Sequence, residues 1–529
     1  MKKADIVITN ARIYDGCSNP PYKADMAICK DRIEEIGNCS AYEARERIDA
    51  KGLALAPGFV DTHVHSDLML LYDRQHANGL CQGVTTEILG QDGLSYAPLS
   101  GDRLEDYVKY IAGLNGNPDI PHTWSSVWSY MSNFDGKAAV NTAYLIPHGA
   151  LRLEIAGFKD CVLTKQMLEK AQRLLAQGIE EGAVGMSTGL SYFPGSYADT
   201  QELIELARVL AEYGVPYVTH LRSVFKKAWF DPTGEAIRIA EESGAPLHFS
   251  HYRTWPKNAG KVQELMKDID DAEARGVDIS LELYPYPTGA GYLVAALPGW
   301  AVEGGWEATL RRLADKGQRE RILPYVEKSE VIREQRFTHL RYHTEYAGQT
   351  FEEVAQKRNQ TVAEMVCELL WEEKLEIGIC GDFQRVRAET VRQLELDMLS
   401  LLERPNYMIG SDGIPVGLHP HPRAFGTFPR LLRFCREYGF PLEKMINRIT
   451  LVPCNRFGFT DRGVIQKGKF ADLVLFDPET ICDTATYECP RCAPTGVVLV
   501  VVNGKIAVRD GKVTGIFAGR WLRRERDAK

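Results

Sequence analysis

The sequence predicts an α/β protein built on a (β/α)₈ barrel of the TIM type. Eight short apolar runs punctuate the chain, and between several of them apolar residues recur at helical spacing. Strands that alternate with helices are typical of a parallel sheet or barrel, and eight units complete a barrel. The predicted strands end near His65, Asp92, His148, Ser187, His220, His251, Tyr284 and Asp412. The clearest helical runs cover residues 165–181, 200–213, 233–243 and 262–275.

The two ends of the chain have a different pattern, with short runs of alternating apolar and polar residues. Residues 1–55 contain several such runs, and residues 459–529 contain two of them separated by an Asn503-Gly504 turn. Strand, Asn-Gly turn and strand together are a strong hairpin signal. We therefore expect residues 1–55 and 459–529 to pair as a small β-sandwich beside a barrel of residues 56–458.

Residues 292–400 are too many for one connection between the seventh and eighth strands. Helical patterns occur at residues 306–316, 350–357 and 361–374. This predicts an inserted helical subdomain, which we interpret as a lid that excludes water and selects part of the substrate. His339 and His343 lie in the insert, and we interpret them as ordinary residues of it.

Composition narrows the class of partner. The 529 residues include 63 basic and 71 acidic side chains, for a net charge of −8, which argues against nucleic acid or an anionic membrane as a partner. No apolar run is long enough for a membrane span, and Asp5, Asn10 and Arg12 interrupt the first one too early for a signal peptide. We therefore expect a cytoplasmic protein that acts on a small molecule, as a monomer or a homo-oligomer.

Cysteine usage agrees with a reducing compartment. The twelve cysteines are scattered without a disulfide framework, so they are expected to be free thiols. The one close pair, Cys489 and Cys492, lacks a second pair at zinc-finger spacing. It is interpreted as a loop with two thiols rather than a metal site.

The chemistry is indicated by histidines and aspartates at the predicted strand ends. His63 and His65 lie two residues apart on one strand, so both side chains can reach the same point. Asp92, His220, His251 and Asp412 follow the second, fifth, sixth and eighth strands. Each histidine alone is more often structural, but in a barrel all six positions meet at one rim. The set predicts a centre for one or two divalent metal ions.

At this point the chain resembles the amidohydrolase superfamily and, within it, the N-acyl-D-amino-acid deacylase (D-aminoacylase) family. The resemblance covers nearly the whole length and is strongest in the last two of the matching motifs. These motifs lie at residues 56–65 (APGFVDTHVH), 182–190 (GAVGMSTGL), 219–222 (THLR), 284–286 (YPY), 410–413 (GSDG) and 421–430 (HPRAFGTFPR).

The resemblance implies metal-dependent hydrolysis of the amide bond of N-acyl-D-amino acids. It makes His63 and His65 ligands of one ion, and His220 and His251 ligands of a neighbouring one. Asp412 becomes both a ligand and the residue that moves the proton between the attacking water and the departing nitrogen. Zinc is the expected ion.

One departure leaves the metal open. The family usually has a cysteine ligand where this chain has Asp92, and a carboxylate is a harder ligand that can bridge two ions, so manganese or iron are alternatives to zinc. Residues 182–187 also lack the lysine that hydantoinases and dihydroorotases carboxylate, which counts against a cyclic amide as the substrate. A dipeptidase or cyclic-amide hydrolase and a non-catalytic scaffold stay open as alternatives.

Family positions also suggest how the substrate carboxylate is bound. Arg423 occupies the position of the carboxylate-binding arginine, and Arg253 replaces a common lysine. Tyr286 and Tyr192 match family tyrosines that help to bind the carboxylate, and a packing role is the alternative for either. Ala290 stands where relatives have a serine. A salt-bridging role for Arg423 is the alternative. His148 and Glu154 lie close to the rim and are left out of the metal set.

Overall fold

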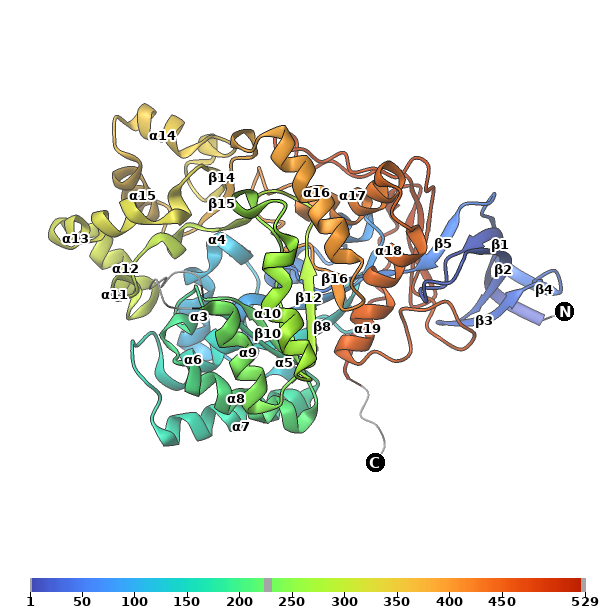
Figure 1. Cartoon of the computed structure of the whole chain (residues 1–529), viewed down its shortest axis with the longest axis horizontal. Coiled ribbons are helices and arrows are strands. Elements are labelled where there is room, and N and C mark those ends of the chain that lie inside the picture. Colours follow the sequence, from blue (N-terminus) through green and yellow to red (C-terminus); the bar gives the residue numbers. More distant parts are fainter. Residues whose placement is uncertain (1, 223–230, 525–529) are drawn as a thin grey trace.

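The structure is a computed structural model that describes residues 2–222 and 231–524. Its centre is an eight-stranded parallel sheet in the order β16-β12-β11-β10-β9-β8-β7-β6 (Figure 1). The backbone N–H of Asp412 donates to the carbonyl of His63 at 2.7 Å, which brings the last strand beside the first and closes the barrel. The predicted barrel is therefore confirmed. Its strands are β6 (Phe59–Asp61), β7 (Val84–Leu89), β8 (Asn141–Pro147), β9 (Gly185–Gly189), β10 (Tyr217–His220), β11 (Leu247–Phe249), β12 (Ile279–Leu283) and β16 (Tyr407–Ile409).

Helices follow the barrel strands, and four of them match the predicted runs to within a residue. These are α7 (Lys165–Glu181), α8 (Thr200–Tyr213), α9 (Pro232–Ser243) and α10 (Val262–Ala274). The side chains of Thr164, Asp199 and Asp231 cap the first turns of α7, α8 and α9. Gly214 and Gly244 end α8 and α9 in the left-handed conformation that glycine adopts without strain.

Other helices cover the remaining sides of the barrel. They are α1 (Asp67–Tyr72), α2 (Ala77–Leu80), α3 (Gly101–Tyr110), α4 (Ala112–Asn115), α5 (Val127–Met131), α6 (His148–Ala156), α16 (Ala388–Leu402), α17 (Arg423–Tyr438), α18 (Leu442–Ile449) and α19 (Leu451–Phe457). A compact apolar cluster joins barrel residues such as Val60, Val218 and Met408 to Phe457 of α19. This packing fills the barrel next to α19, and the polar residues described below lie after the carboxyl ends of the strands.

Both ends of the chain contribute to a second sheet of nine strands. Its order is β20-β19-β18-β17-β5-β1-β2-β3, and β4 pairs with β1 in parallel. The strands are β1 (Lys2–Ile13), β2 (Tyr22–Cys29), β3 (Arg32–Gly37), β4 (Tyr42–Asp49), β5 (Ala54–Pro57), β17 (Leu473–Phe476), β18 (Val497–Val502), β19 (Lys505–Arg509) and β20 (Lys512–Val513). Ile8, Ile28, Leu475 and Val501 share one buried core. The ends therefore pack together as expected, and β5 joins them into one hydrogen-bonded sheet because it pairs with both β1 and β17.

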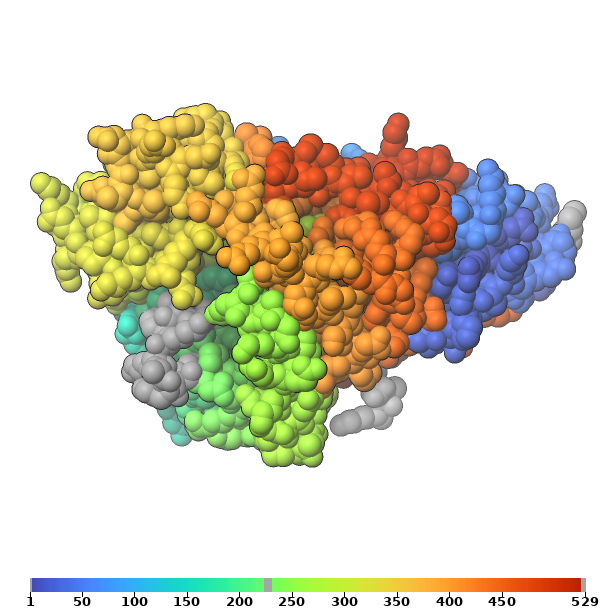
Figure 2. All heavy atoms as spheres, turned by 45° about the horizontal axis from the view of Figure 1, so that its top comes forward, coloured from blue at the N-terminus to red at the C-terminus, as the bar shows by residue number. Residues whose placement is uncertain are grey.

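Residues 290–381, between β12 and α16, form a separate layer of the molecule, at the opposite side from the N-terminal strands of the terminal sheet in Figure 1 and Figure 2. Its helices are α11 (Gly299–Val302), α12 (Gly305–Ala314), α13 (Lys316–Lys328), α14 (Phe351–Arg358) and α15 (Val362–Glu372). The sequence pattern predicts only helices here, whereas the structure adds a three-stranded sheet of β13 (Ala290–Tyr292), β15 (Ile377–Gly381) and β14 (Gln335–Leu340). These strands are short and pair only with one another, so periodicity alone does not reveal them.

Among the described residues, none of the helices has the combination of length and apolar character that a membrane span requires.

Candidate metal centre

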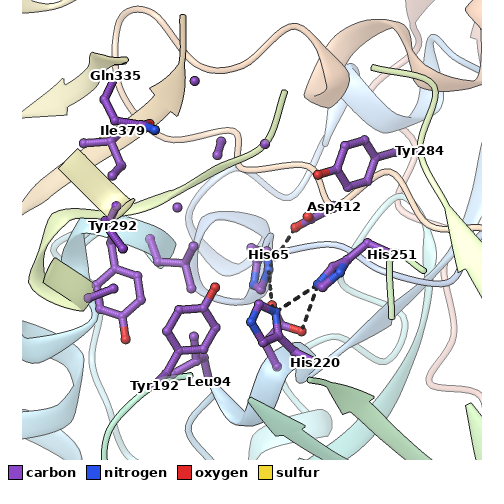
Figure 3. Close-up of a pocket in the computed structure, with 18 of the residues that line it drawn as sticks. His65, Leu94, Tyr192, His220, His251, Tyr284, Tyr292, Gln335, Ile379 and Asp412 are labelled. Atoms are coloured by element: carbon purple, nitrogen blue, oxygen red, sulfur yellow. Dashed lines mark hydrogen bonds and ion pairs between the residues drawn. The ribbon is translucent and has the colours of Figure 1, made fainter. Parts of the chain in front are cut away.

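Asp92 lies at the centre of four histidine rings. Its two carboxylate oxygens are 3.5 Å from His63 Nε2, 3.7 Å from His65 Nε2, 3.6 Å from His220 Nδ1 and 3.9 Å from His251 Nε2. The rings come from the ends of β6, β10 and β11, and Asp92 lies in a 3₁₀ turn after β7. Residues that are far apart in the sequence therefore meet at one rim of the barrel, as Figure 3 shows for three of the histidines.

Asp412 completes this set from the loop after β16. Its Oδ1 atom lies 3.3 Å from His65 Nε2 and 3.7 Å from His63 Nε2. The ligand atoms fall into three overlapping triads, each with all atoms within 4.8 Å of one another. His63 Nε2 and Asp92 Oδ1 are buried without a hydrogen-bond partner, which is costly unless another group binds them. The six residues thus have the donor types and the unpaired atoms that fit a divalent cation.

Three of these six residues have a strained backbone. The φ angles of Asp92, His251 and Asp412 are +54°, +38° and +52°, in the left-handed region that residues with a Cβ rarely adopt. Such conformations persist only where the surroundings enforce them, and they concentrate at functional sites.

The charges in the centre favour ion binding. Burial alone would raise the pKa of Asp92 and of Asp412, but nearby positive groups outweigh it. The His63 and His220 rings lower the pKa of Asp92. Arg423 and the His63 ring lower the pKa of Asp412. Both carboxylates are therefore ionised. Burial lowers the pKa of His251, which keeps its ring neutral. At His63, burial would lower the pKa, but the carboxylates of Asp92, Glu282 and Asp412 outweigh it and raise the pKa. A bound cation must therefore displace a proton from His63.

A cavity of about 300 Å³ opens beside the six residues. Figure 3 shows His65, His220, His251 and Asp412 at its base, with Tyr192 and Tyr292 along one side. Val331, Gln335 and Ile379 of the insert line its far side, so the insert shapes the space above the centre. Among the described residues, the lining contains no lysine or arginine, and its remaining members are Asp92, Leu94, Leu114, Trp255, Tyr284, Gly289, Ala290, Gly291, Ala295 and Gly381.

Comparison with known proteins places this arrangement in a family. The model of the Amidohydrolase family (Amidohydro_3) matches residues 46–508, which include the barrel, the insert and all six residues of the centre. The chain is a member of the amidohydrolase family. The resemblance predicted from the motifs is thereby confirmed.

Several relatives that match nearly the full length of this amidohydrolase are deacylases. It is 32% identical to the D-aminoacylase of Alcaligenes xylosoxydans xylosoxydans, with 98% of each chain covered. The crystal structure of N-acyl-D-glutamate deacylase from Bordetella bronchiseptica, complexed with zinc and a phosphonate inhibitor, matches with a TM-score of 0.80 and 30% identity over 99% of this chain and 100% of that one. A D-aminoacylase structure described by its binuclear metal centre matches with a TM-score of 0.81 and 31% identity, over 98% of this chain and 100% of that one.

The two arginines predicted to bind the substrate carboxylate are both buried beside the cavity. Their guanidinium groups lie over the ring of Tyr284, at 4.4 Å for Arg253 and 4.6 Å for Arg423. Arg253 also stacks on Trp255 at 4.0 Å, and its Nε and Nη2 atoms have no hydrogen-bond partner. Buried, unpaired donors on a charged group need an anion nearby. The Nη1 atom of Arg253 donates to the Thr254 carbonyl at 3.2 Å, and no acidic side chain among the described residues forms an ion pair with Arg253.

Arg423 has a partner already. Its Nη1 atom lies 3.0 Å from Asp412 Oδ2, and its Nη2 atom donates to the carbonyl of Ala290 at 3.3 Å. The two oxygens of Asp412 are thus divided, one toward the histidines and one toward Arg423. This is the salt-bridging alternative of the sequence prediction, although the arginine is fully buried rather than at the surface. Direct contact between Arg423 and a substrate stays a prediction.

The two predicted tyrosines lie in different places. Tyr192 lines the cavity, with its ring 4.8 Å from that of His220. Tyr286 is absent from the described lining of that cavity and packs under Arg430, whose guanidinium lies 4.7 Å from the ring. The Tyr286 hydroxyl is buried without a hydrogen-bond partner. Its role in substrate binding therefore stays a prediction that the cavity geometry does not support.

Three other histidines and Glu154, which the sequence analysis left out of the metal set, have separate partners. His148 Nε2 lies 2.9 Å from Glu202, which also binds Arg152, and none of the candidate metal triads includes it. Glu154 pairs with Arg103 at 3.3 Å. In the insert, His339 lies 3.1 Å from Glu376 and His343 pairs with Glu373. These contacts account for all four residues as parts of the packing.

Glu282 is a functional residue that the sequence reasoning missed. Its carboxylate accepts from His63 Nδ1 at 2.6 Å, contacts His248 Nε2 at 3.2 Å and accepts from the Thr62 hydroxyl. The hydrogen bond to Nδ1 leaves the lone pair of His63 on Nε2, which faces Asp92 and Asp412. The His63 charge and the bonds from His248 and His63 outweigh burial and lower the pKa of Glu282. The sequence offered one signal for this role, because Glu282 is an acidic residue within the mostly apolar strand β12.

We expect Glu282→Gln to weaken ion binding about 10- to 100-fold, because the neutral amide no longer fixes the tautomer and orientation of His63. A competition titration against a chromophoric chelator measures the affinity, and the Co(II) absorption spectrum reports the ligand geometry. Glu202→Gln is the matched control, since Glu202 is also buried and also binds a histidine. It should leave the affinity unchanged. Equal affinities for Glu282→Gln and the unmodified chain would rule out the positioning role.

Proposed function

We propose that this amidohydrolase hydrolyses the amide bond of N-acyl-D-amino acids and releases a carboxylic acid and a D-amino acid. One observation carries the proposal: the buried centre of four histidines and two aspartates adjoins a cavity beside a buried guanidinium, that of Arg253, which has no anionic partner among the residues that the structure describes. That combination suits a substrate with an amide to be cleaved and a carboxylate to be bound. The full-length relatives named above act on compounds of this class.

The ion would be held by His63, His65, Asp92, His220, His251 and Asp412. Zinc is our first choice, as one ion or two, and manganese or iron are alternatives because Asp92 supplies oxygen where relatives have sulfur. When bound, such an ion lowers the pKa of water and polarises an amide carbonyl. The scaffold alternative is disfavoured because a potential ligand is retained at each of the six positions.

Asp412 is positioned to move the proton. Its Oδ1 atom faces the histidines at the base of the cavity, where an attacking water and the amide nitrogen would both be within reach. Arg423 holds the other carboxylate oxygen at 3.0 Å, so the side chain cannot rotate away. Asp412 would accept the proton of the water and deliver it to the departing nitrogen.

Arg253 would bind the substrate carboxylate. Its free Nε and Nη2 donors are held in a plane by stacking on Trp255 and Tyr284, which suits the two oxygens of a carboxylate. Val331, Gln335 and Ile379 would then lie along the acyl group or the side chain. This fits the lid that the insert was predicted to form.

A substrate panel tests the proposal. N-acyl-D-amino acids, their L-enantiomers, dipeptides and hydantoins are offered to protein of measured metal content. We expect release of free amine from the D-compounds at rates at least tenfold above those of every other class. Hydrolysis of dipeptides or hydantoins alone would favour the runner-up activities, and metal-replete protein without any turnover would favour the scaffold.

Replacing Arg253 by Met should raise KM for N-acyl-D-amino acids about 10- to 100-fold, because a charge-assisted hydrogen bond of about 1.5–3 kcal/mol is lost. Methionine keeps much of the apolar stem that packs on Trp255. The change in kcat should be much smaller. Arg423→Met is the contrasting variant, since it removes the partner of Asp412 and should lower kcat. Steady-state kinetics that show the same KM and kcat effects for both arginines would contradict this division.

A further inference from the structure

A second chemical group lies apart from the metal centre, in the turn of residues 486–492. The Sγ atoms of Cys489 and Cys492 are 2.9 Å apart. A disulfide requires about 2.05 Å, so a shift of less than an ångström would join them. Cys489 is exposed and Cys492 partly exposed, and a reagent from solvent can therefore reach the pair.

The turn is held in place on both sides of the cysteines. Cys489 donates its backbone N–H to the Thr486 hydroxyl at 3.0 Å and accepts from the Thr486 N–H at 3.2 Å. Arg491 donates to the carbonyls of Pro415 and Gly417, in the loop between Asp412 and Arg423. Tyr487 lies 3.0 Å from His421 of the same loop. The two thiols are thus kept together by neighbours that do not depend on a bond between them.

The surroundings favour thiol chemistry over metal binding. None of the groups of three or more metal-ligand side chains found among the described residues includes either cysteine. The hydrogen bond between the two thiols, with burial second, raises the pKa of the Cys492 thiol. Cys489 is also the more exposed of the two thiols, so we expect it to react first with a reagent from solvent.

We propose that Cys489 and Cys492 form a reversible dithiol–disulfide site for small disulfides of the glutathione type. The Cys489 thiolate attacks the small disulfide, forms a mixed disulfide and expels one small thiolate. The Cys492 thiolate then attacks Cys489 Sγ and expels the second. In balance, two protein thiols and one small disulfide give one protein disulfide and two small thiols, and the two protons pass to the small thiolates.

Other cysteines provide internal comparisons. Burial raises the pKa of Cys367, Cys380 and Cys454 to about 12, so these thiols should stay unreacted. Cys17 is also exposed, and no second cysteine among the described residues is in contact with it. It is the matched single thiol.

The test is to equilibrate the whole protein with graded ratios of oxidised to reduced glutathione and to map cysteines by peptide mass spectrometry. We expect the 489–492 disulfide to be half formed at a ratio of oxidised to reduced glutathione about tenfold or more below the ratio that half modifies Cys17. The reason is that the second step, closure of the pair, is intramolecular. Half modification of Cys489 and Cys17 at the same ratio, or absence of the 489–492 disulfide, would overturn the proposal.

Two variants test the order of the steps. Cys492→Ser should trap glutathione on Cys489 as a stable mixed disulfide, and Cys489→Ser should slow modification of Cys492. The assignment would be contradicted if glutathione were trapped faster on Cys492 in the Cys489→Ser variant than on Cys489 in the Cys492→Ser variant. Neither experiment uses a substrate or the metal, so the outcome is independent of the deacylase activity proposed above.

Discussion

Asp412→Asn should reduce kcat about 10²- to 10⁴-fold, the usual contribution of a positioned acid–base group. Asparagine matches the size of the aspartate and tolerates the φ of +52° at this position, so the fold should be kept. The amide cannot accept the proton of an attacking water. The measurement is steady-state turnover of an N-acyl-D-amino acid, with metal content and thermal unfolding determined on the same sample.

Metal content decides how this result is interpreted. Asp412 is also one of the proposed ligands, so a loss of turnover with a loss of metal would not isolate proton transfer. Turnover is therefore compared at saturating zinc and at saturating manganese. Asp397→Asn is the control, because Asp397 is a buried aspartate that binds Thr254 and the Gly260 N–H away from the centre. Unchanged kcat in the metal-replete Asp412→Asn variant would remove Asp412 from the mechanism.

Much of the site could be predicted because its residues follow a rule of barrel geometry. A residue that comes directly after a parallel strand must lie at the same rim as every other such residue. Strand ends are visible in the sequence as apolar runs followed by glycine, histidine or aspartate. His220 and Asp412 could therefore be assigned to one place although they are almost two hundred positions apart.

The missed features depend on three-dimensional partners. Glu282 is buried at the cost of desolvation, and only the positions of His63 and His248 on neighbouring strands explain why it is there. The ion pair between Asp412 and Arg423 likewise joins the loop after β16 to the first residue of α17. No periodicity along the chain specifies such pairs.

The two tyrosines after β12 show a further limit. Tyr284 and Tyr286 are two residues apart, and on a continuous strand both would face the same side. β12 ends at Leu283, however, so both tyrosines lie beyond the continuous strand and this rule does not apply to them. Tyr284 lines the cavity, whereas Tyr286 packs under Arg430. The prediction assigned the second tyrosine to the substrate because family position, and not strand geometry, supported it.

Asp92 should be the residue on which metal binding depends most. Each of the four histidine rings lies within 3.9 Å of its carboxylate, and it supplies negative charge among rings that otherwise gather positive charge on protonation. We expect Asp92→Asn to lower ion affinity about 100-fold or more and to reduce turnover in parallel. Asparagine is isosteric and accepts the φ of +54°, so the metal-free variant should unfold within a few degrees of the metal-free parent.

Asp92→Cys separates charge from ligand type. A thiolate is anionic like the carboxylate but softer, so this variant should recover zinc binding while its affinity for manganese stays low. The ratio of zinc to manganese affinity, measured by competition titration, should thus rise about tenfold or more relative to the parent chain. A ratio that does not change, or an Asp92→Asn variant that retains full ion affinity, would mean that the histidines and Asp412 hold the ion without Asp92. The carboxylate would then be explained only by its charge interactions with the surrounding rings.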